Sequence, residues 1–288
     1  MKFENIRVMN FENAIRGMRN PKNSWDLSDS KFGLNGMVCV SSRADIEQME
    51  VAQKWAAVFC EQENQKADFI NPVFRQQEKL SQQWLEQNGI IHTYETDDGN
   101  TFLYEYAYIG PNDMKLAQSL IQAGSEHRKF MRQIFVSVDI TAPLYVWKEI
   151  DTYKVATVAN STSTMHKLTS TPITKECFEM DDFHSIEFDG GEVDNIINYC
   201  EKLRQEYIKT KDKKVWKELI RWLPESYLQK RTMTMNYENL LGMCSKGQRR
   251  FHKLNEWSGI DDKTLTNFMQ FVRSLPYAQE LIFIDELI

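Results

Sequence analysis

Hydrophobic and polar residues alternate along residues 134–140, and a period of two predicts a β-strand with one buried face. The apolar residues that would share this face are Ile134, Val136, Val138 and Ile140. The chain then passes Ala142 and Pro143 and enters a short predicted helix that carries Trp147. The pattern therefore predicts a strand that is followed at once by a helix.

Other segments repeat their apolar residues at helical spacing. The clearest runs from 193 to 207, where one face is formed by Ile196, Ile197, Cys200, Leu203 and Tyr207. Further helices are predicted at 45–59, 72–87, 112–124, 215–224, 236–243 and 264–274. Asn112 and Asn236 each open one of them, and their side chains are suited to cap the first turn. Helices are therefore expected to dominate the second half of the chain.

The segment from 90 to 110 has the composition of a β-hairpin. Two runs rich in β-branched and aromatic residues flank the sequence Asp-Asp-Gly-Asn at 97–100, which favours a tight turn. Together with the strand at 134–140, this places the predicted strands in the first half of the chain. No βαβ alternation appears. The predicted class is α+β, with a mixed or antiparallel sheet packed with helices.

Composition limits the kind of partner. The formal net charge is -6 and the sequence pI is about 5.5, which argues against a protein that coats nucleic acid through its overall charge. We expect small molecules or other proteins as partners, with no nucleic acid and no membrane. No apolar run approaches the length of a membrane span, and no signal-peptide core is present at the N-terminus, so a soluble, cytoplasmic protein is expected.

Cysteine and histidine spacing excludes several kinds of site. The 5 cysteines are scattered and never form a CxxC motif, so neither a disulfide framework nor a zinc site is predicted. The 5 histidines never form a close pair, and we expect no metal. The signatures of phosphate loops, zincins and serine hydrolases are also absent. The common hydrolytic and nucleotide-binding motifs therefore do not explain this chain.

Two polar stretches could form a site. A basic cluster near the C-terminus contains Lys230, Arg231, Lys246, Arg249, Arg250 and Lys253. It is either a set of solvated helix faces or a phosphate or carboxylate site, for which the arginine fork is suited. The stretch from Asn160 to His166 holds four consecutive hydroxyl residues without the glycine or proline of a flexible linker. It lies between apolar segments, so its polar groups need partners.

The order of these pieces resembles the flavin-dependent thymidylate synthases. The family signature Arg-His-Arg-x-x-Ser, followed by Ser-x-Arg, falls on Thr152-Tyr153-Lys154-x-x-Thr157 and then on Thr162-x-Thr164. The match is in position and hydroxyl character, and the signature arginines are replaced. Hydroxyl groups would then serve as neutral donors where the family has cations.

Other segments extend the resemblance towards both ends of the chain. The segment SEHRKFMRQIF places His127 where the family has a residue near flavin and folate. The segment LPESYLQKRTMTMN resembles a family segment in which an arginine contacts the nucleotide and an asparagine contacts flavin; these positions fall on Lys230 and Asn236. A later nucleotide-contacting arginine of the family falls on Arg249. Near the N-terminus, AIRGMRNP is similar to the family's start. The resemblance implies a single domain over residues 1–288 with an insertion at about 35–108.

In this family, FAD is reduced by NADPH, a one-carbon unit passes from methylenetetrahydrofolate to dUMP, and reductive methylation yields dTMP. The resemblance implies the same activity here, with no covalent nucleophile and with a homotetramer whose sites lie between subunits. The implied cofactor-binding residues are His127, Thr152, Tyr153, Lys154, Thr157 and Asn236. The implied substrate-binding residues are Asn160, Thr162, Thr164, Lys230 and Arg249.

Two other functions remain open. The altered signature permits a related flavin-dependent modification of a pyrimidine nucleotide, such as hydroxymethylation. The chain could also be a non-catalytic binding or structural protein that retains the fold. Flavin binding separates the enzymes from the non-catalytic protein, and product mass separates the two enzymes.

Overall fold

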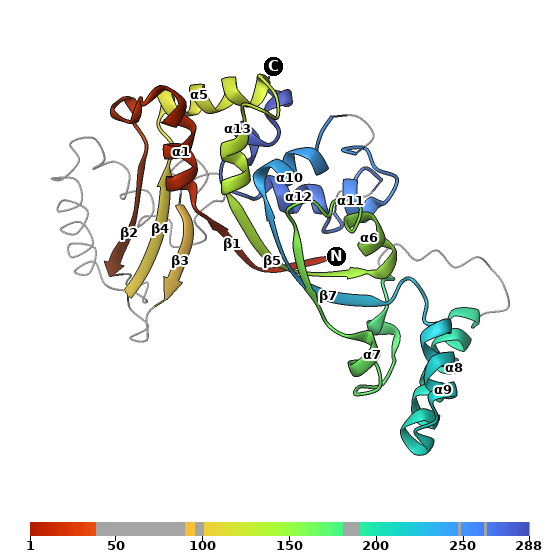
Figure 1. Ribbon diagram of the computed structural model, residues 1–288. Helices are drawn as coiled ribbons and strands as arrows, with labels where there is room; N and C mark the ends of the chain where they lie inside the picture. The colour runs from red at the N-terminus through yellow and green to blue at the C-terminus, as the bar shows by residue number, and fades with distance from the viewer. Residues whose placement is uncertain (39–89, 96–100, 181–190, 247–248, 262–263, 288) are drawn as a thin grey trace. The chain divides into compact units, whose positions relative to one another are not determined.

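The computed structural model describes residues 1–38, 90–95, 101–180, 191–246, 249–261 and 264–287 (Figure 1). The chain divides into two compact units, each made of two segments. Unit 1 comprises residues 1–6 and 136–272, and unit 2 comprises residues 7–135 and 273–288. The helices predicted at 45–59 and 72–87 and the turn at 97–100 lie outside the described residues. The single domain expected from the sequence stays a prediction.

Unit 1 is built on a four-stranded sheet with the strand order β1-β5-β7-β6. The strands are β1 (Lys2–Met9), β5 (Phe135–Pro143), β6 (Val158–Ser161) and β7 (Leu228–Asn236). The predicted alternation is confirmed in β5, where Val136, Val138 and Ile140 are fully buried. Strands β6 and β7 were not predicted, and the expectation that the strands lie in the first half of the chain is wrong for them. Strand β6 is only 4 residues long, and β7 has a polar and basic run at 229–232, so its alternation is confined to Met233 and Met235 and is too short to identify a strand.

Unit 1 also contains several helices. They are α6 (Leu144–Ile150), α7 (Thr164–Lys167), α8 (Glu192–Thr210), α9 (Lys213–Trp222), α10 (Tyr237–Met243), α11 (Asn255–Ser258) and α12 (Phe268–Arg273). Helices α8 and α9 form a hairpin, and Asp212 caps α9 by accepting a hydrogen bond from the backbone N–H of Lys214 at 2.8 Å. The predicted helices at 193–207, 215–224 and 236–243 are therefore confirmed to within a few residues. The predicted helix at 264–274 is shorter in the structure.

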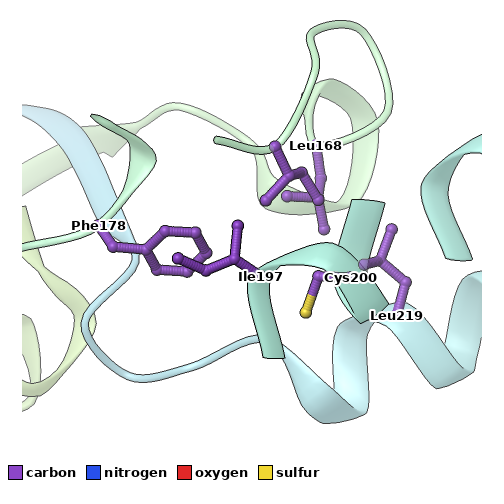
Figure 2. Packing of buried hydrophobic residues seen from close by; sticks show 6 residues of the cluster. Leu168, Phe178, Ile197, Cys200 and Leu219 are labelled. Atoms are coloured by element: carbon purple, nitrogen blue, oxygen red, sulfur yellow. The ribbon is translucent and has the colours of Figure 1, made fainter. Parts of the chain in front are cut away.

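The α8–α9 hairpin has a small core of its own (Figure 2). The buried residues of this core come from both helices and from the segment after α7; they are Leu168, Ile173, Phe178, Ile197, Cys200 and Leu219. An ion pair between Arg204 and Glu201 closes one side at 2.7 Å, and Arg204 also donates to the carbonyl of Thr169 at 3.1 Å. The hairpin is thus anchored to the segment before it by both packing and charge.

Unit 2 contains a three-stranded antiparallel sheet with the order β2-β4-β3. Its strands are β2 (Lys31–Val38), β3 (Ile90–Glu95) and β4 (Thr101–Tyr108), so the two strands of the predicted hairpin are confirmed. Its helices are α1 (Phe11–Arg19), α5 (Pro111–Gln122) and α13 (Ala278–Leu281). The Tyr277 hydroxyl donates to the Ala107 carbonyl at 2.9 Å and accepts from the Ile109 N–H at 3.0 Å. This side chain fastens the last segment of the unit to the end of β4.

The observed class is α+β, as predicted, with strands paired antiparallel where the pairing is described and helices packed around them. Among the described residues, no helix combines the length and the apolar character needed to cross a membrane.

Candidate functional site

The residues matched to the first part of the family signature, Arg-His-Arg-x-x-Ser, lie on the loop at 151–157, which joins α6 to β6 in unit 1. The Thr152 hydroxyl donates to the Glu149 carbonyl at 2.8 Å, and the Thr157 hydroxyl donates to the Tyr153 carbonyl at 2.9 Å. Lys154 is exposed. These local bonds fold the loop back on the end of α6.

The hydrogen bonds of the loop restrict the chemistry of its hydroxyl groups. A threonine hydroxyl has one proton, and Thr152 and Thr157 each give it to a backbone carbonyl. Thr162 does the same, because its hydroxyl donates to the Lys230 carbonyl at 3.1 Å. In this conformation the three hydroxyls can accept hydrogen bonds but have no second proton to donate. Of the four consecutive hydroxyl residues at 161–164 that were expected to serve as neutral donors, Thr162 therefore has no free proton to donate in this conformation.

Strand pairing brings the two predicted substrate-binding segments together. Strand β6 runs antiparallel to β7, with Asn160 opposite Thr232 and Ser161 opposite Arg231. Beyond the end of β6, the backbone N–H of Thr162 donates to the Lys230 carbonyl at 2.8 Å. Asn160 and Thr162 are exposed, and Thr164 is the first residue of α7. Asn160 on the edge strand β6 and Thr162 just beyond it thus lie beside Lys230, which is on the neighbouring inner strand β7.

Lys230 is surrounded by carboxylates. Its ammonium lies 3.1 Å from Glu4 and 3.3 Å from Asp139, and these two groups raise the pKa of Lys230 above its ordinary value. Asp139 also accepts hydrogen bonds from Thr232 at 2.6 Å and from Asn5 at 2.9 Å, and its pKa is lowered. The positive charge of Lys230 is therefore already compensated within the sheet.

Asn236 caps helix α10. Its side-chain oxygen accepts the N–H of Asn239 at 2.9 Å, while the Asn239 side-chain oxygen accepts the N–H of Asn236 at 3.1 Å, which forms a capping box. Asn236 is only 2% exposed, so the capping role predicted from the sequence is confirmed. Asn239 also donates from its Nδ2 to the Val155 carbonyl at 2.8 Å. The start of α10 is thus bonded directly to the loop at 151–157.

Arg249 lies over the aromatic ring of Tyr153. Its guanidinium carbon is 5.3 Å from the ring centroid, and one guanidinium nitrogen donates to the Gly242 carbonyl at 2.8 Å. Arg249 is exposed, so its remaining donors lie at the surface. Tyr153 also stacks on Trp257 with a centroid distance of 5.7 Å. Burial is the main reason that the pKa of Tyr153 is raised.

Sequence reasoning missed two residues of this region. Asn239 follows Asn236 by three positions, which is the spacing of a capping box, so the sequence carried a signal for its first role. Trp257 carried none, although it is fully buried and also stacks on Phe268 at 4.6 Å. Its indole nitrogen is buried without a hydrogen-bond partner within the described part of the chain. The aromatic stack fixes the orientation of the Tyr153 ring.

His127, the remaining predicted residue, belongs to unit 2. It is exposed and borders a hollow of about 1170 Å³ between the end of α1 and helix α5. Apolar side chains of Met18, Leu116, Leu120 and Phe130 line part of this hollow. The other predicted residues all lie in unit 1.

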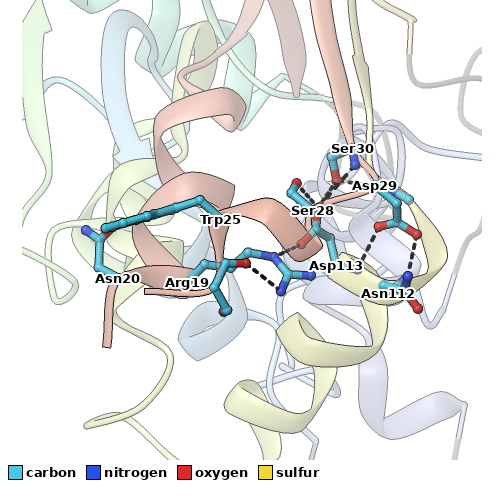
Figure 3. Close-up of polar contacts among 10 residues, drawn as sticks. Arg19, Asn20, Trp25, Ser28, Asp29, Ser30, Asn112 and Asp113 are labelled. Atoms are coloured by element: carbon cyan, nitrogen blue, oxygen red, sulfur yellow. Dashed lines mark hydrogen bonds and ion pairs between the residues drawn. The ribbon is translucent and has the colours of Figure 1, made fainter. Parts of the chain in front are cut away.

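One wall of the hollow in unit 2 is a network around the buried Asp113 (Figure 3). Asp113 accepts hydrogen bonds from Arg19, Ser28 and Ser30, each at 2.5 Å. Asp29 accepts the N–H groups of Asn112 at 2.8 Å and Asp113 at 3.1 Å, and so caps α5. Asn112, which the sequence suggested as the cap, is therefore inside the helix, whose first residue is Pro111.

Within the described ranges, no group of three or more histidine, cysteine, aspartate and glutamate residues could hold a metal ion. No protein-family model matches the sequence, and no curated protein matches it.

Three solved structures share a low similarity with this chain. A flavin-dependent thymidylate synthase from Helicobacter pylori, complexed with FAD and dUMP, aligns with a TM-score of 0.43 and 16% identity over 66% of this chain and 86% of that one. A second structure of thymidylate synthase X from Helicobacter pylori, with FAD and dUMP, has a TM-score of 0.42 and 15% identity over 61% and 83% of the two chains. A UMP/dUMP methylase from Streptomyces cacaoi has a TM-score of 0.33 and 11% identity over 45% and 63%. At such TM-scores and identities, neither the fold nor the function of this chain follows from the similarity.

Proposed function

We propose that this protein is a flavin-dependent enzyme that modifies a pyrimidine nucleotide, and that its reaction is the reductive methylation of dUMP to dTMP. The proposal includes FAD as the bound cofactor, NADPH as reductant and methylenetetrahydrofolate as one-carbon donor. It also includes a cytoplasmic homotetramer, without nucleic acid or membrane as a partner. The order of sequence segments that resembles the flavin-dependent thymidylate synthases is the starting point.

One observation carries the proposal. The segments that the resemblance assigns to flavin and nucleotide are far apart in the sequence, yet they are in contact within unit 1. Asn239 Nδ2 bonds the Val155 carbonyl across 84 residues, and Arg249 lies over the ring of Tyr153. A resemblance that arose by chance would give no reason for these segments to meet.

The side chains of this region can bind an anionic, planar ligand. Lys154 and Arg249 are exposed cations near Tyr153: Lys154 follows it in the chain, and Arg249 lies over its ring. Both can bind phosphate, and arginine can do so with two donors at once. Lys230 is less well placed for this role, because Glu4 and Asp139 already compensate its charge. The donor set therefore fits the phosphate groups of FAD and of a nucleotide through Lys154 and Arg249.

The protein's own contribution would be binding and orientation. When bound, the reduced flavin supplies the hydride, so no nucleophilic side chain is needed. The loop at 151–157 would hold the cofactor, with Thr152 and Thr157 as acceptors and Lys154 as the cation. Asn160, Thr162 and Thr164 would line the nucleotide with Arg249. Correct placement of the two ligands would supply much of the rate, because it removes the entropic cost of bringing them together.

The decisive experiment is a titration of the purified full chain with FAD, followed by flavin fluorescence, with and without dUMP. We expect saturable FAD binding that leaves the protein yellow. Incubation with dUMP, NADPH and methylenetetrahydrofolate should then give a product in which a methyl group replaces one ring hydrogen of dUMP. A chain that binds no FAD under either condition would exclude both flavin enzymes and leave the non-catalytic protein. A product with one hydroxymethyl group would replace methylation by hydroxymethylation.

A further inference from the structure

The loop at 151–157 contains a backbone conformation that residues other than glycine rarely adopt. Ala156 has a φ of 60°, which lies in the left-handed region. Such a conformation is strained for alanine, and it persists only where the surrounding structure holds the chain in place. Some contact must therefore hold this part of the loop.

The side chains of residues 154–156 do not provide this contact. Lys154, Val155 and Ala156 are all exposed, and Val155 is 84% exposed. The backbone is held instead: within the loop, Thr157 bonds the carbonyls of Tyr153 and Lys154, and from outside the loop the Asn239 amide nitrogen donates to the Val155 carbonyl oxygen at 2.8 Å. That carbonyl belongs to the peptide group that precedes Ala156. The hydrogen bond therefore fixes the peptide plane whose rotation defines the unusual φ.

Asn239 is in turn fixed at the start of α10. Its side-chain oxygen accepts the N–H of Asn236 at 3.1 Å, and its own N–H donates to the Asn236 side chain at 2.9 Å. Both ends of the Asn239 amide are thus engaged, the oxygen in the helix cap and the nitrogen on the loop. A carboxylate of the same size could keep the first bond but not the second, because it has no proton to donate.

We propose that Asn239 is a positioning residue, which holds the loop at 151–157 in the conformation that binds the flavin cofactor. This inference rests on the proposed function, in which Thr152, Lys154 and Thr157 contact FAD. Asn239 acts through the Val155 carbonyl and the left-handed conformation of Ala156. The proposed nucleotide-binding residue Asn160 is held by the pairing of β6 with β7, and Arg249 is held outside the loop by its bond to the Gly242 carbonyl at 2.8 Å, so neither depends on the Asn239 bond alone.

The test begins with Asn239→Asp, which keeps the helix cap and removes the donor to the loop. We expect FAD binding to weaken about tenfold, as for the loss of one well-placed hydrogen bond, and dUMP binding to stay within about twofold. Asn198→Asp is the matched control, because Asn198 is an exposed asparagine on α8 and undergoes the same chemical change. It should leave the FAD dissociation constant unchanged.

Rescue by a backbone change distinguishes positioning from general stability. Glycine adopts a positive φ without strain, so adding Ala156→Gly to Asn239→Asp should restore part of the FAD affinity. Conversely, Ala156→Val keeps Asn239 but disfavours the left-handed conformation. This single substitution should weaken FAD binding and leave dUMP binding within about twofold. This second variant tests the inference even if Asn239→Asp does not fold.

The outcomes separate the two proposals. If the unmodified chain binds no FAD, the proposed function is wrong and the inference is wrong with it. If the unmodified chain binds FAD and both Asn239→Asp and Ala156→Val bind it equally well, only the inference is wrong. A loss of FAD affinity that parallels a fall in melting temperature and is not rescued by Ala156→Gly would reduce Asn239 to a structural residue, which also overturns the inference.

Discussion

The charged side chains at the centre of the Asp113 network in unit 2, Arg19 and Asp113, are buried, whereas Lys154 and Arg249, at the loop of residues 151–157 in unit 1, are exposed. Arg19 is 5% exposed, and its guanidinium is bonded to Asp113 and to the carbonyl of Ser24. Asp113 is fully buried, and although burial raises its pKa, the bonds from Ser28, Ser30 and Arg19 lower it below its ordinary value. Arg249, by contrast, is exposed and lies over an aromatic ring.

This difference distinguishes charges that hold the fold from charges that can bind a ligand. A buried charge must be paired within the protein, because an unpaired one is far less stable there than in water. A charge at the surface loses little without a partner and remains able to bind a phosphate. The loop at 151–157 is therefore the better candidate for binding, and the Asp113 network is the better candidate for stability. Four measurements would test this contrast.

The largest effect is expected for Asp113→Asn. The substitution leaves Arg19 buried without its carboxylate, so the free energy of unfolding should fall by about 3–5 kcal/mol. Asp26→Asn is the control, since Asp26 is exposed in the same unit, and it should change stability by less than about 0.5 kcal/mol. Urea denaturation followed by circular dichroism measures both. Equal stabilities for the two variants would show that the Asp113 network does not stabilise the fold.

The Glu201–Arg204 pair in the α8–α9 hairpin should make stability depend on pH. In the folded protein the pKa of Glu201 is lowered from 4.5 to about 2, chiefly because Glu201 accepts hydrogen bonds from Arg204. The stabilisation is therefore fully present above pH 4.5 and is lost as the pH falls towards 2. It amounts to about 3 kcal/mol. Unfolding measured across this range should show the loss.

Glu201→Gln should make that pH dependence shallower, because the residue no longer titrates. Glu192→Gln, an exposed change on the same helix, should leave the profile unchanged. An identical profile for Glu201→Gln and the unmodified chain would show that this ion pair does not support the hairpin.

Arg249→Ala tests the binding side of the contrast. Loss of a charge-assisted bond to phosphate should weaken dUMP binding by about tenfold to a hundredfold, and FAD binding less. Arg221→Ala is the control, because Arg221 is an exposed arginine that pairs with Glu218 on α9. Calorimetric titration with each ligand gives the dissociation constants. Equal losses of affinity for dUMP and FAD would indicate that Arg249 does not correspond to the family's nucleotide-contacting arginine.

The smallest effect is expected for Lys230→Met. The ammonium already has Glu4 and Asp139 as partners, so its removal should change dUMP binding by no more than about twofold. Lys202→Met, at an exposed position on α8, is the matched control. A loss as large as that of Arg249→Ala would place Lys230 in the nucleotide site, as the resemblance implies.

The sequence was sufficient to predict a helix, a strand or a cap where the pattern that identifies it lies within the element itself. The alternation at 134–140 identified β5, and the apolar face at 193–207 identified α8. Asn236 was correctly expected to cap α10, because a cap acts within one turn of its own helix. Each of these signals is local, so the rest of the chain does not alter it.

Features that depend on distant partners could not be predicted in this way. The cap of α5 is Asp29, which is 83 residues away in the sequence, whereas the local pattern pointed to Asn112. Strand β7 is basic and polar, and it was missed because its partners in the sheet define it as a strand. The same reason applies to Asn239, whose contact with Val155 has no local signature. Compensation of Lys230 by Glu4 and Asp139 likewise appears only in the folded sheet.

The two hydrogen bonds of Tyr277 have a consequence for how the protein is made on the ribosome. This side chain is 7% exposed, burial raises its pKa to about 12, and its partners Ala107 and Ile109 lie in a segment that is synthesised much earlier. Translation of the residues between 135 and 273 takes on the order of ten seconds. During that interval the backbone groups of Ala107 and Ile109 lack their partner. Unit 2 therefore cannot complete its folding during synthesis of its first segment, and a nascent chain stalled before residue 273 should be readily cleaved by protease near the end of β4.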